Sequence, residues 1–372
     1  MESYKVMLVE PDTGLLQKLA DTVQHTSGFQ MTAAYSTLRD AVNQGSVFRP
    51  NLILLDMEKV EDYSVVREFV QRFPEARILC MGRAWTMSAF RAAVTAGAAG
   101  YLVAPFTGED LANSVKSFQT KQEVSTVMTF FSPKGKSGRS TFLAYMAASL
   151  ASRTGSRVGI IDGDLQFGDL ALFFDVLPQS TISEAVRDIR FLSPPSLQSY
   201  FVPLTEQISF LCGTRGPEYA EQITPDALTE LIQMARGLFR YILIDLPAGF
   251  NSISVAACEA ADTVHLMSMI NTGYEIRHMG KALDIFSAWD NYKTKVHALF
   301  NRVDPCTEEM RKALEEELHF PVYGILPNEY IPLSQAADRG RILSDIDKDS
   351  PFCRAVEGVA EKTLRDEGGS PS

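Results

Sequence analysis

Short apolar runs alternate with amphipathic stretches along almost the whole chain, and this alternation restricts the possible folds more than any other feature. In the first part of the chain the apolar runs are Tyr4–Val9, Asn51–Asp56, Arg77–Met81 and Gly100–Val103. Runs without a polar residue at every second place are typical of strands buried on both faces of a parallel sheet. Helical patterns separate these runs, at Thr13–Thr26, Tyr63–Arg72, Met87–Ala96 and Gly108–Phe118. Residues 1–119 are therefore predicted to form a doubly wound α/β domain.

The same pattern starts again after a polar stretch, Gln119–Ser125, which lacks helical periodicity. Residues 120–125 are predicted to be a linker, and residues 126–372 a second doubly wound parallel-sheet domain. In that domain a strand at Thr126–Phe131 precedes a loop and a helix from about Ser140 to Arg153. Further strands are expected at Arg157–Ile161, Ile208–Cys212, Tyr241–Asp245, Thr263–Met267, Lys295–Asn301 and Pro321–Ile325. The final ~25 residues turn polar and are expected to fray.

The loop between the first strand and helix of the second domain reads Ser132-Pro133-Lys134-Gly135-Lys136-Ser137-Gly138-Arg139-Ser140-Thr141. Backbone N–H groups and the positive end of a helix converge on an anion at such a place. In the usual phosphate-binding loop, GxxxxGK[ST], a Gly stands where this chain has Pro133 and a Lys stands where it has Arg139. By itself the loop also fits an ordinary polar turn.

Three later segments favour a nucleotide site over an ordinary turn. Asp162 and Asp164 come at the end of the next strand, and Asp245 ends another apolar strand. An Asp in that place is expected to hold Mg²⁺ through water. Asn301 and Arg302 follow a further strand, where a side-chain amide could read a base. All of these residues stand at carboxyl ends of strands, which meet at one edge of a parallel sheet.

Together these residues resemble the deviant Walker A ATPases of the MinD/ParA class, whose loop reads KGGxGK[ST]; the resemblance covers roughly residues 124–345. It implies that ATP and Mg²⁺ are cofactors, and that two subunits sandwich ATP with Lys134 reaching the partner's phosphates. It implies catalytic roles for Lys134, Arg139 and Asp164, and Mg²⁺ ligation by Ser140, Asp162 and Asp245, the Asp residues through water. The implied cofactor contacts are Lys134, Gly135, Lys136, Ser137, Gly138, Arg139, Ser140, Thr141, Asn301, Arg302, Pro327, Asn328 and Glu329.

The loop departs from the pattern of that class at two positions. Arg139 keeps the positive charge of the usual Lys, but its guanidinium is longer, planar and forked. Lys136 replaces a Gly, which costs ~1–3 kcal/mol if the position needs an unusual φ. Because transition-state geometry tolerates little misplacement, ATP binding with slow hydrolysis is expected. The chain is accordingly predicted to be a slow ATPase used as a switch.

Residues 1–119 resemble a response-regulator receiver domain. Asp56 matches the phosphorylated Asp, and residues 96–106 (AGAAGYLVAPF) match a characteristic stretch. Glu10 and Asp12 are the remaining acidic residues, but Pro11 stands between them. Ala104 occupies the position of the usual Lys, and Gly82 (or Met81) that of the usual Ser or Thr. Glu10, Asp12 and Asp56 are therefore predicted to form a vestigial site, with Asp56 a solvated carboxylate, and the domain to be a docking or dimerisation surface.

A degenerate receiver followed by a deviant Walker A ATPase resembles the TadZ/CpaE family, which positions the tight-adherence (Flp-type) pilus secretion machinery. The resemblance implies a cytoplasmic homodimeric switch, located at a cell pole or at the inner face of the membrane through protein partners. Residues 164–170 (DLQFGDL), 325–330 (ILPNEY) and 335–343 (QAADRGRIL) add to this resemblance.

Two alternatives share the same ATP loop. A ParA-like DNA-partitioning ATPase would need a basic surface, whereas 35 Lys and Arg against 46 Asp and Glu make the net charge -11. A MinD-like membrane switch would need a basic amphipathic C-terminal helix, and residues 351–366 mix both signs of charge. No apolar stretch approaches the ~20 residues that cross a bilayer. Nucleic-acid binding, direct membrane binding and a transmembrane segment are therefore not expected.

Overall fold

The computed structural model describes residues 3–60, 62–116, 125–270, 273–345 and 347–368. The chain forms two compact units, one of Met1–Glu123 with Arg187–Ser199 and one of Val124–Val186 with Tyr200–Ser372. Residues 120–124 of the predicted linker lie outside the described residues. The sequence pattern predicts residues 126–372 as one continuous domain, whereas Arg187–Ser199 belongs to the first unit. Within that unit the Ser196 hydroxyl donates to Asp110 at 2.7 Å.

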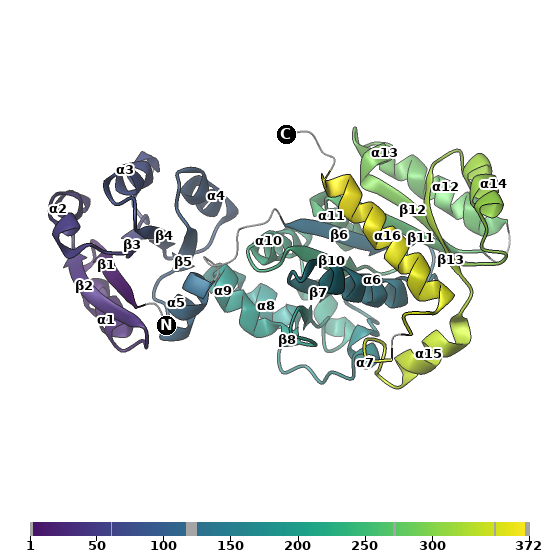
Figure 1. Ribbon diagram of the computed structural model, residues 1–372, viewed down its shortest axis with the longest axis horizontal. Helices are drawn as coiled ribbons and strands as arrows, with labels where there is room; N and C mark the ends of the chain where they lie inside the picture. Colours follow the sequence, from purple (N-terminus) through teal and green to yellow (C-terminus); the bar gives the residue numbers. More distant parts are fainter. Residues whose placement is uncertain (1–2, 61, 117–124, 271–272, 346, 369–372) are drawn as a thin grey trace. The chain divides into compact units, whose positions relative to one another are not determined.

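The first unit contains a five-stranded parallel sheet in the order β2-β1-β3-β4-β5 (Figure 1). Its strands are β1 (Tyr4–Val9), β2 (Phe29–Tyr35), β3 (Leu52–Asp56), β4 (Arg77–Gly82) and β5 (Gly100–Val103). Its helices are α1 (Thr13–Gln24), α2 (Leu38–Gln44), α3 (Ser64–Arg72), α4 (Met87–Thr95), α5 (Gly108–Lys116) and α9 (Pro194–Leu197). The predicted α/β class is confirmed, but β2 and α2 were not predicted. β2 is an edge strand without a fully buried residue, so it lacks the apolar run that marks the other strands.

The strand order of the first unit reverses next to β1, which is where ligands bind in open α/β sheets. β1 pairs with β3 in parallel register from Val6↔Leu52 to Val9↔Leu55. Glu10 directly follows β1 and Asp56 ends β3, so the register brings these two carboxylates to the same edge of the sheet.

The second unit contains an eight-stranded sheet in the order β13-β12-β11-β6-β10-β7-β9-β8. All its neighbouring strands are parallel except β8 and β9. Its strands are β6 (Thr126–Phe131), β7 (Val158–Asp162), β8 (Val202–Pro203), β9 (Ile208–Leu211), β10 (Tyr241–Asp245), β11 (Thr263–Met269), β12 (Val296–Val303) and β13 (Val322–Pro327). The predicted second parallel sheet is confirmed, with only the two-residue β8 unforeseen.

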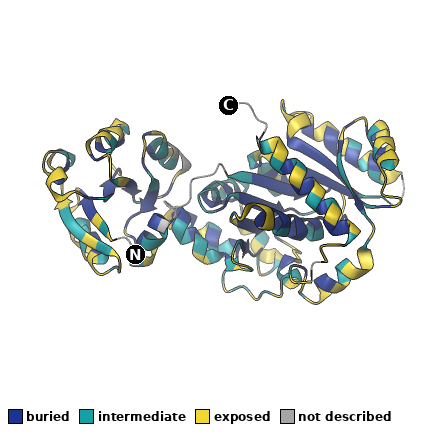
Figure 2. Cartoon of the chain, viewed as in Figure 1, coloured by how far each residue is buried: buried dark blue, intermediate teal, exposed yellow. Residues whose placement is uncertain are grey.

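Helices lie on both faces of the second sheet, and its central strands are buried (Figures 1 and 2). They are α6 (Arg139–Thr154), α7 (Leu170–Phe173), α8 (Ile182–Asp188), α10 (Pro225–Ala235), α11 (Ser252–Ala260), α12 (Tyr274–Phe286), α13 (Tyr292–Lys295), α14 (Glu308–Leu318), α15 (Tyr330–Asp338) and α16 (Pro351–Gly368). Short 3₁₀ segments are η1 (Gly45–Phe48) and η3 (Ile189–Phe191) in the first unit, η5 (Pro217–Gln222) in the second, and η4 (Gln198–Tyr200), which begins in the first unit and ends in the second. α6 ends at Gly155, whose φ of +66° stops the helix.

The C-terminal helix α16 corrects the expectation that the last ~25 residues fray. Phe352, Val356 and Ala360 are spaced along one face of the helix and are buried in the core. Near its end Glu367 accepts from Arg240 at 2.6 Å. The polar composition marks only the exposed face of an amphipathic helix, so residues up to 368 are held in the fold. Among the described residues, no helix is both long and apolar enough to cross a membrane.

Candidate functional site

The loop from β6 to α6 contains two residues whose backbone lies in the left-handed region. Gly138 has a φ of +83°, and a Cβ there would lie 2.2 Å from Nδ2 of Asn301. Only glycine therefore fits at 138 without movement of Asn301. Lys136 has a φ of +66°, so the replacement of a glycine at this position does strain the backbone, by ~1–3 kcal/mol.

Side chains of this loop divide into an exposed group and a buried group. Lys134, Gly135 and Lys136 are exposed, whereas Ser137 and Arg139 are buried. The Ser132 hydroxyl donates to the carbonyl of Lys134 at 2.6 Å, which fixes the first turn of the loop. The Lys134 side chain therefore lies toward solvent. The buried pair continues into the first turn of α6, where Ser140 and Thr141 are half-buried.

Two buried carboxylates stand beside the start of α6. Asp162 and Asp245 end the neighbouring strands β7 and β10 in direct register, and the Ser140 hydroxyl donates to Oδ2 of Asp245. Burial, with the nearby charges of Asp245 and Asp164, raises the pKa of Asp162 well above its usual range. Burial also raises the pKa of Asp245, although Arg139 and the Ser140 hydrogen bond oppose that shift. A bound cation would favour the ionised form of both groups.

Three buried polar atoms at this place have no hydrogen-bond partner within the part of the chain that the structure describes. They are Nη1 of Arg139, Oγ of Ser137 and Oδ1 of Asp245. Two are donors that suit phosphate oxygens, and the third is an acceptor that suits a cation or its water. The residues present therefore fit a magnesium nucleotide. The described residues hold no cluster of three or more His, Cys, Asp or Glu side chains for a metal, so hydroxyl, water and phosphate oxygens would complete the coordination.

Two glycines that the sequence did not indicate fix the position of Asp162. A Cβ on Gly168 would lie 2.3 Å from Oδ2 of Asp162, and one on Gly213 would lie 3.3 Å from its Cγ. Asp164 lies beside them, because its backbone N–H donates to Oδ1 of Asp162 at 3.1 Å. Neither glycine was predicted as a site residue. The sequence feature that could have pointed to Gly168 is its place in the DLQFGDL stretch, and no such feature marks Gly213.

Replacing Gly168 with Ala is expected to displace the Asp162 carboxylate, because the added Cβ would lie 2.3 Å from one of its oxygens. The factor by which Mg²⁺ strengthens ATP binding should then fall by about tenfold or more. Calorimetric titration with ATP at several Mg²⁺ concentrations measures the effect. Gly280→Ala, on α12, is the matched control because nothing lies within 4 Å of its added Cβ. Equal Mg²⁺ dependence in both variants would contradict the assigned role of Asp162.

Asn301, Arg302 and Glu329 were predicted to contact the cofactor, and each has a structural contact of its own. Nδ2 of Asn301 donates to the carbonyl of Ser137 at 3.0 Å, and its Oδ1 accepts from the Arg302 N–H at 2.8 Å. The Arg302 guanidinium lies 4.5 Å from the centre of the Tyr330 ring. Glu329 accepts from the Phe352 N–H, at the start of α16, at 2.8 Å. Base reading by Asn301 stays a prediction.

Two further predicted cofactor contacts lie at the carboxyl end of β13. Pro327 ends the strand and is half-buried, and Asn328 follows it and is exposed. Tyr330 was not predicted as a site residue, although it stands in the ILPNEY stretch and is 55% exposed. An exposed ring stacked under a guanidinium is a surface on which a base could lie.

In the first unit, the acidic residues lie in a different setting from the one expected. Asp56 is 4% exposed rather than solvated, and Glu10 is fully buried. Burial and the charge of Glu10 raise the pKa of Asp56 to about 6, with Arg83 acting in the opposite direction. Asp12 is exposed and caps α1 by accepting from the Leu15 N–H at 3.0 Å. Its backbone N–H donates to Oε1 of Glu10 at 2.9 Å, so Asp12 stands next to the buried carboxylates while its own side chain is exposed.

Sequence reasoning missed Arg83, which with Glu10 and Asp56 makes up the acidic pocket of the first unit. Its guanidinium donates to Glu10 at 2.9 Å and to Asp56 at 3.1 Å. The neighbouring Gly82 explains the missing Ser or Thr, because a Cβ there would lie 2.0 Å from the Tyr101 hydroxyl. The one sequence signal for Arg83 was a basic residue immediately after the end of β4.

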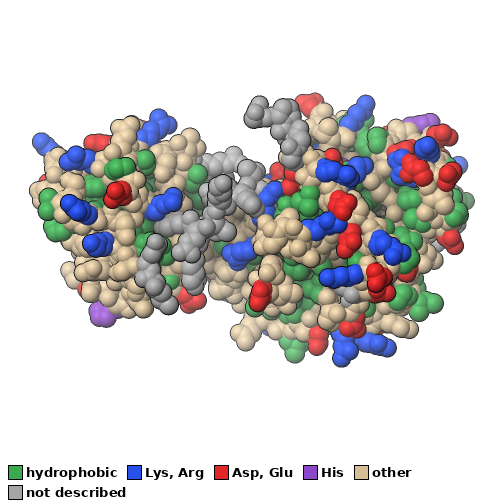
Figure 3. Space-filling model, in the orientation of Figure 1, with side chains coloured by type: hydrophobic (Ala, Val, Ile, Leu, Met, Phe, Trp, Pro, Cys, Tyr) green, Lys and Arg blue, Asp and Glu red, His purple; other side chains and the backbone are tan. Residues whose placement is uncertain are grey.

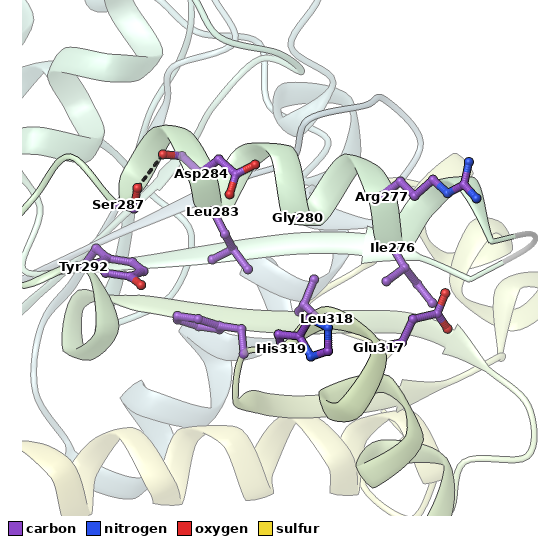
Figure 4. Close-up of a pocket in the computed structure, with 11 residues that line it drawn as sticks. Ile276, Arg277, Gly280, Leu283, Asp284, Ser287, Tyr292, Glu317, Leu318 and His319 are labelled. Carbon is purple, nitrogen blue, oxygen red and sulfur yellow. Dashed lines mark hydrogen bonds between the residues drawn. The ribbon is translucent and has the colours of Figure 1, made fainter.

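A cavity of about 510 Å³ lies elsewhere in the second unit, between α12 and the C-terminal end of α14 (Figure 4). Its lining includes Arg277, Asp284, Tyr292 and His319, and none of its lining residues belongs to the loop at residues 132–141.

On the face drawn in Figure 3, basic and acidic side chains are interspersed rather than gathered by sign.

No protein-family model matches the chain. The chain is 26% identical over 235 residues to an uncharacterized ATP-binding protein of Methanocaldococcus jannaschii, covering 63% of this chain and 85% of that protein. It is 27% identical over 256 residues to the septum site-determining protein MinD of Helicobacter pylori, covering 66% and 92%. Sequence and fold together support homology to the MinD/ParA-family P-loop ATPases.

Solved structures show the same fold. A ParA family ATPase from Chlorobium tepidum has a TM-score of 0.58 at 18% identity, covering 64% of this chain and 98% of that one. MinD of Pyrococcus horikoshii, solved with Mg-ADP, has a TM-score of 0.55 at 20% identity, covering 66% and 98%. The MinC:MinD complex of Aquifex aeolicus has a TM-score of 0.53 at 20% identity, covering 67% and 98%.

Proposed function

We propose that the second unit binds ATP with Mg²⁺ and hydrolyses it slowly, as a switch. The observation that carries this proposal is the buried Nη1 of Arg139, which has no partner among the described residues and lies at the start of a helix that follows a strand and a strained loop. A guanidinium in that setting is stabilised by an anion. The relative solved with Mg-ADP adds support for nucleotide and magnesium as the ligands.

In this proposal each buried group has a defined task. Arg139 and Ser137 donate to phosphate oxygens, and Ser140 with Asp245 holds the cation. Bound Mg²⁺ supplies positive charge to the phosphates. Asp162 would help to hold the cation, and Asp164, whose backbone N–H donates to Asp162, would orient the attacking water. The strain at Lys136 and the longer reach of Arg139 place these groups less well for the transition state, so turnover is slow.

ATP is further proposed to join two copies of the chain. The exposure of Lys134 supports this, because a lysine that is exposed in one copy is accessible to phosphates held by a second copy. In this arrangement ATP binding forms the homodimer and hydrolysis releases it. Lys134→Ala would then separate dimerisation from nucleotide binding.

Purified protein tests the switch directly. With ATP and Mg²⁺ we expect bound nucleotide, a dimer by light scattering, and slow release of phosphate. Lys134→Ala should still bind ATP but remain a monomer, while Lys281→Ala, at an exposed lysine on α12, is the control for loss of one surface charge. Rapid turnover without any partner would contradict the slow switch, and a dimer of Lys134→Ala would contradict its role across the interface.

For the cellular role, we propose that the chain positions the tight-adherence (Flp-type) pilus secretion machinery, in the cytoplasm at a cell pole, through protein partners. The support is the combination of two units: a receiver-like sheet in the order β2-β1-β3-β4-β5 and an ATPase-like sheet. A fluorescent fusion should form polar foci, and deletion should disperse the pilus machinery. Diffuse fusion protein, with pilus machinery unaffected by deletion, would contradict this role.

Two other roles of related ATPases remain open as alternatives. A ParA-like partitioning role would retard DNA at low salt, which the net charge of -11 disfavours. A MinD-like role would sediment the protein with anionic liposomes and ATP. The C-terminal helix α16 disfavours this, because its apolar face is buried in the core rather than available to a membrane.

A further inference from the structure

The acidic pocket at the carboxyl end of the first sheet contains a positive charge from the chain itself. Arg83, at the end of β4, reaches Glu10 beyond β1 with one nitrogen and Asp56 on β3 with the other, at 2.9 and 3.1 Å. Its backbone N–H also donates to Glu58 at 2.6 Å. One residue thus ties three neighbouring segments of the sheet edge together.

The surroundings of the pocket suit a cation of higher charge as well. Glu10 is fully buried, and its Oε2 has no partner among the described residues. Asp56 is nearly as buried, so two carboxylates share a site that one guanidinium neutralises only in part. Mg²⁺ and Mn²⁺ prefer such oxygen ligands. The Arg83 side chain is 33% exposed, so it can leave the pocket without unfolding the strands.

We propose that the Arg83 guanidinium takes the place of a bound divalent ion in the acidic pocket. It acts as a latch, in that its contacts hold the start of the β4–α4 segment in one conformation. The first unit then keeps its conformation without metal or phosphoryl group, and a divalent ion enters only when the guanidinium is removed. Trp85, two residues further on and buried, is held by the same segment.

Mn²⁺ binding to nucleotide-free full-length protein, measured by electron paramagnetic resonance, tests the proposal. Arg83→Gln should bind Mn²⁺ at least about tenfold more tightly than the unaltered chain, and Trp85 fluorescence should change with the metal. Adding Asp56→Asn to Arg83→Gln should abolish the gain, because it removes one of the carboxylates. Arg83→Lys keeps the charge and should gain less than Arg83→Gln.

Arg153→Gln is the matched control, since Arg153 is 34% exposed and pairs with a single carboxylate, Glu361, in the second unit. It should leave Mn²⁺ binding unchanged. Equal Mn²⁺ affinity in Arg83→Gln and the unaltered chain would overturn the proposal.

A measurement on the unaltered chain covers the case in which Arg83→Gln does not fold. The guanidinium N–H signals of Arg83 in NMR spectra should persist in about 10 mM Mg²⁺. This millimolar concentration is on the order of the dissociation constants of weak Ca²⁺ sites or above them. Their loss on adding Mg²⁺ would show that the metal displaces the latch, contrary to the proposal.

Discussion

Replacing Arg139 with Ala is expected to lower the affinity for ATP by about 10- to 100-fold, because a charge-assisted hydrogen bond contributes roughly 1.5–3 kcal/mol. Nη1 of Arg139 is buried at the start of α6, directly after the β6–α6 loop, and has no partner in the described part of the chain. Its loss also removes the charge that opposes the raised pKa of Asp245. Calorimetric titration with ATP and Mg²⁺ measures the change.

Two substitutions separate charge from geometry. Arg139→Lys should retain most of the affinity, because it keeps a cation at the start of α6, and it should hydrolyse ATP faster if the forked guanidinium slows turnover. Arg153→Ala, in the last turn of the same helix, should bind ATP normally. Unchanged affinity in Arg139→Ala would remove the main support for a nucleotide at this loop.

The second large effect is expected on acidification, which should destabilise the second unit as the pH falls below about 6.5. His265 and His297 are paired on β11 and β12, and both rings lie in an aromatic cluster. Burial and the neighbouring charge of His297 lower the pKa of His265 well below its usual range. Burial lowers the pKa of His297 to about 4, with Asp366 opposing and Lys362 adding to the shift.

The folded state favours neutral histidine, so this contribution to stability is complete above pH 6.5 and declines as the pH falls toward 4. For His297 the total loss is about 3 kcal/mol, at ~1.4 kcal/mol for each pKa unit. The urea midpoint at pH 7.5 and 5.0, followed by Trp289 fluorescence in a Trp85→Phe background, measures this decline.

Substitution isolates the two histidines from other acid effects. The double variant His265→Phe, His297→Phe should lose less stability between pH 7.5 and 5.0 than the unaltered chain. It should also be more stable at pH 7.5 if the aromatic stacking survives, since neither ring nitrogen of His265 has a partner among the described residues. His25→Gln changes an exposed histidine and serves as control. An equal fall in the urea midpoint of the double variant would assign the acid sensitivity to other groups.

Particular strands and helices show which parts of the fold could be predicted from the sequence. Strands with continuous apolar runs, such as Leu52–Asp56 and Tyr241–Asp245, were predicted within a residue, because burial on both faces leaves an unmistakable pattern. The edge strand Phe29–Tyr35 was missed, because its half-exposed residues carry no such run. In α16 the polar face concealed a helix whose other face is buried.

For the candidate site, strand ends and the glycine-rich loop were visible in the sequence, since each lies within a few residues of an apolar run. The partners of these residues were not. Nothing local indicates that Gly168 and Gly213 pack against Asp162, or that Asn301 bonds the loop at Ser137. Gly168 follows Asp162 within the same βα unit, whereas the Gly213–Asp162 and Asn301–Ser137 contacts join residues from separate βα units.

The sequence by itself determined the α/β class, the restart of the pattern near residue 126 and the positions of Ser140, Asp162 and Asp245 at strand or helix ends, because these depend on local periodicity. Tertiary structure decided which charges meet. It placed Ser140 on Asp245, left Nη1 of Arg139 without a partner among the described residues, and brought Arg83 onto Glu10 and Asp56 across 73 and 27 residues of chain. Pairings at such separations follow from strand order and register, which no local pattern encodes.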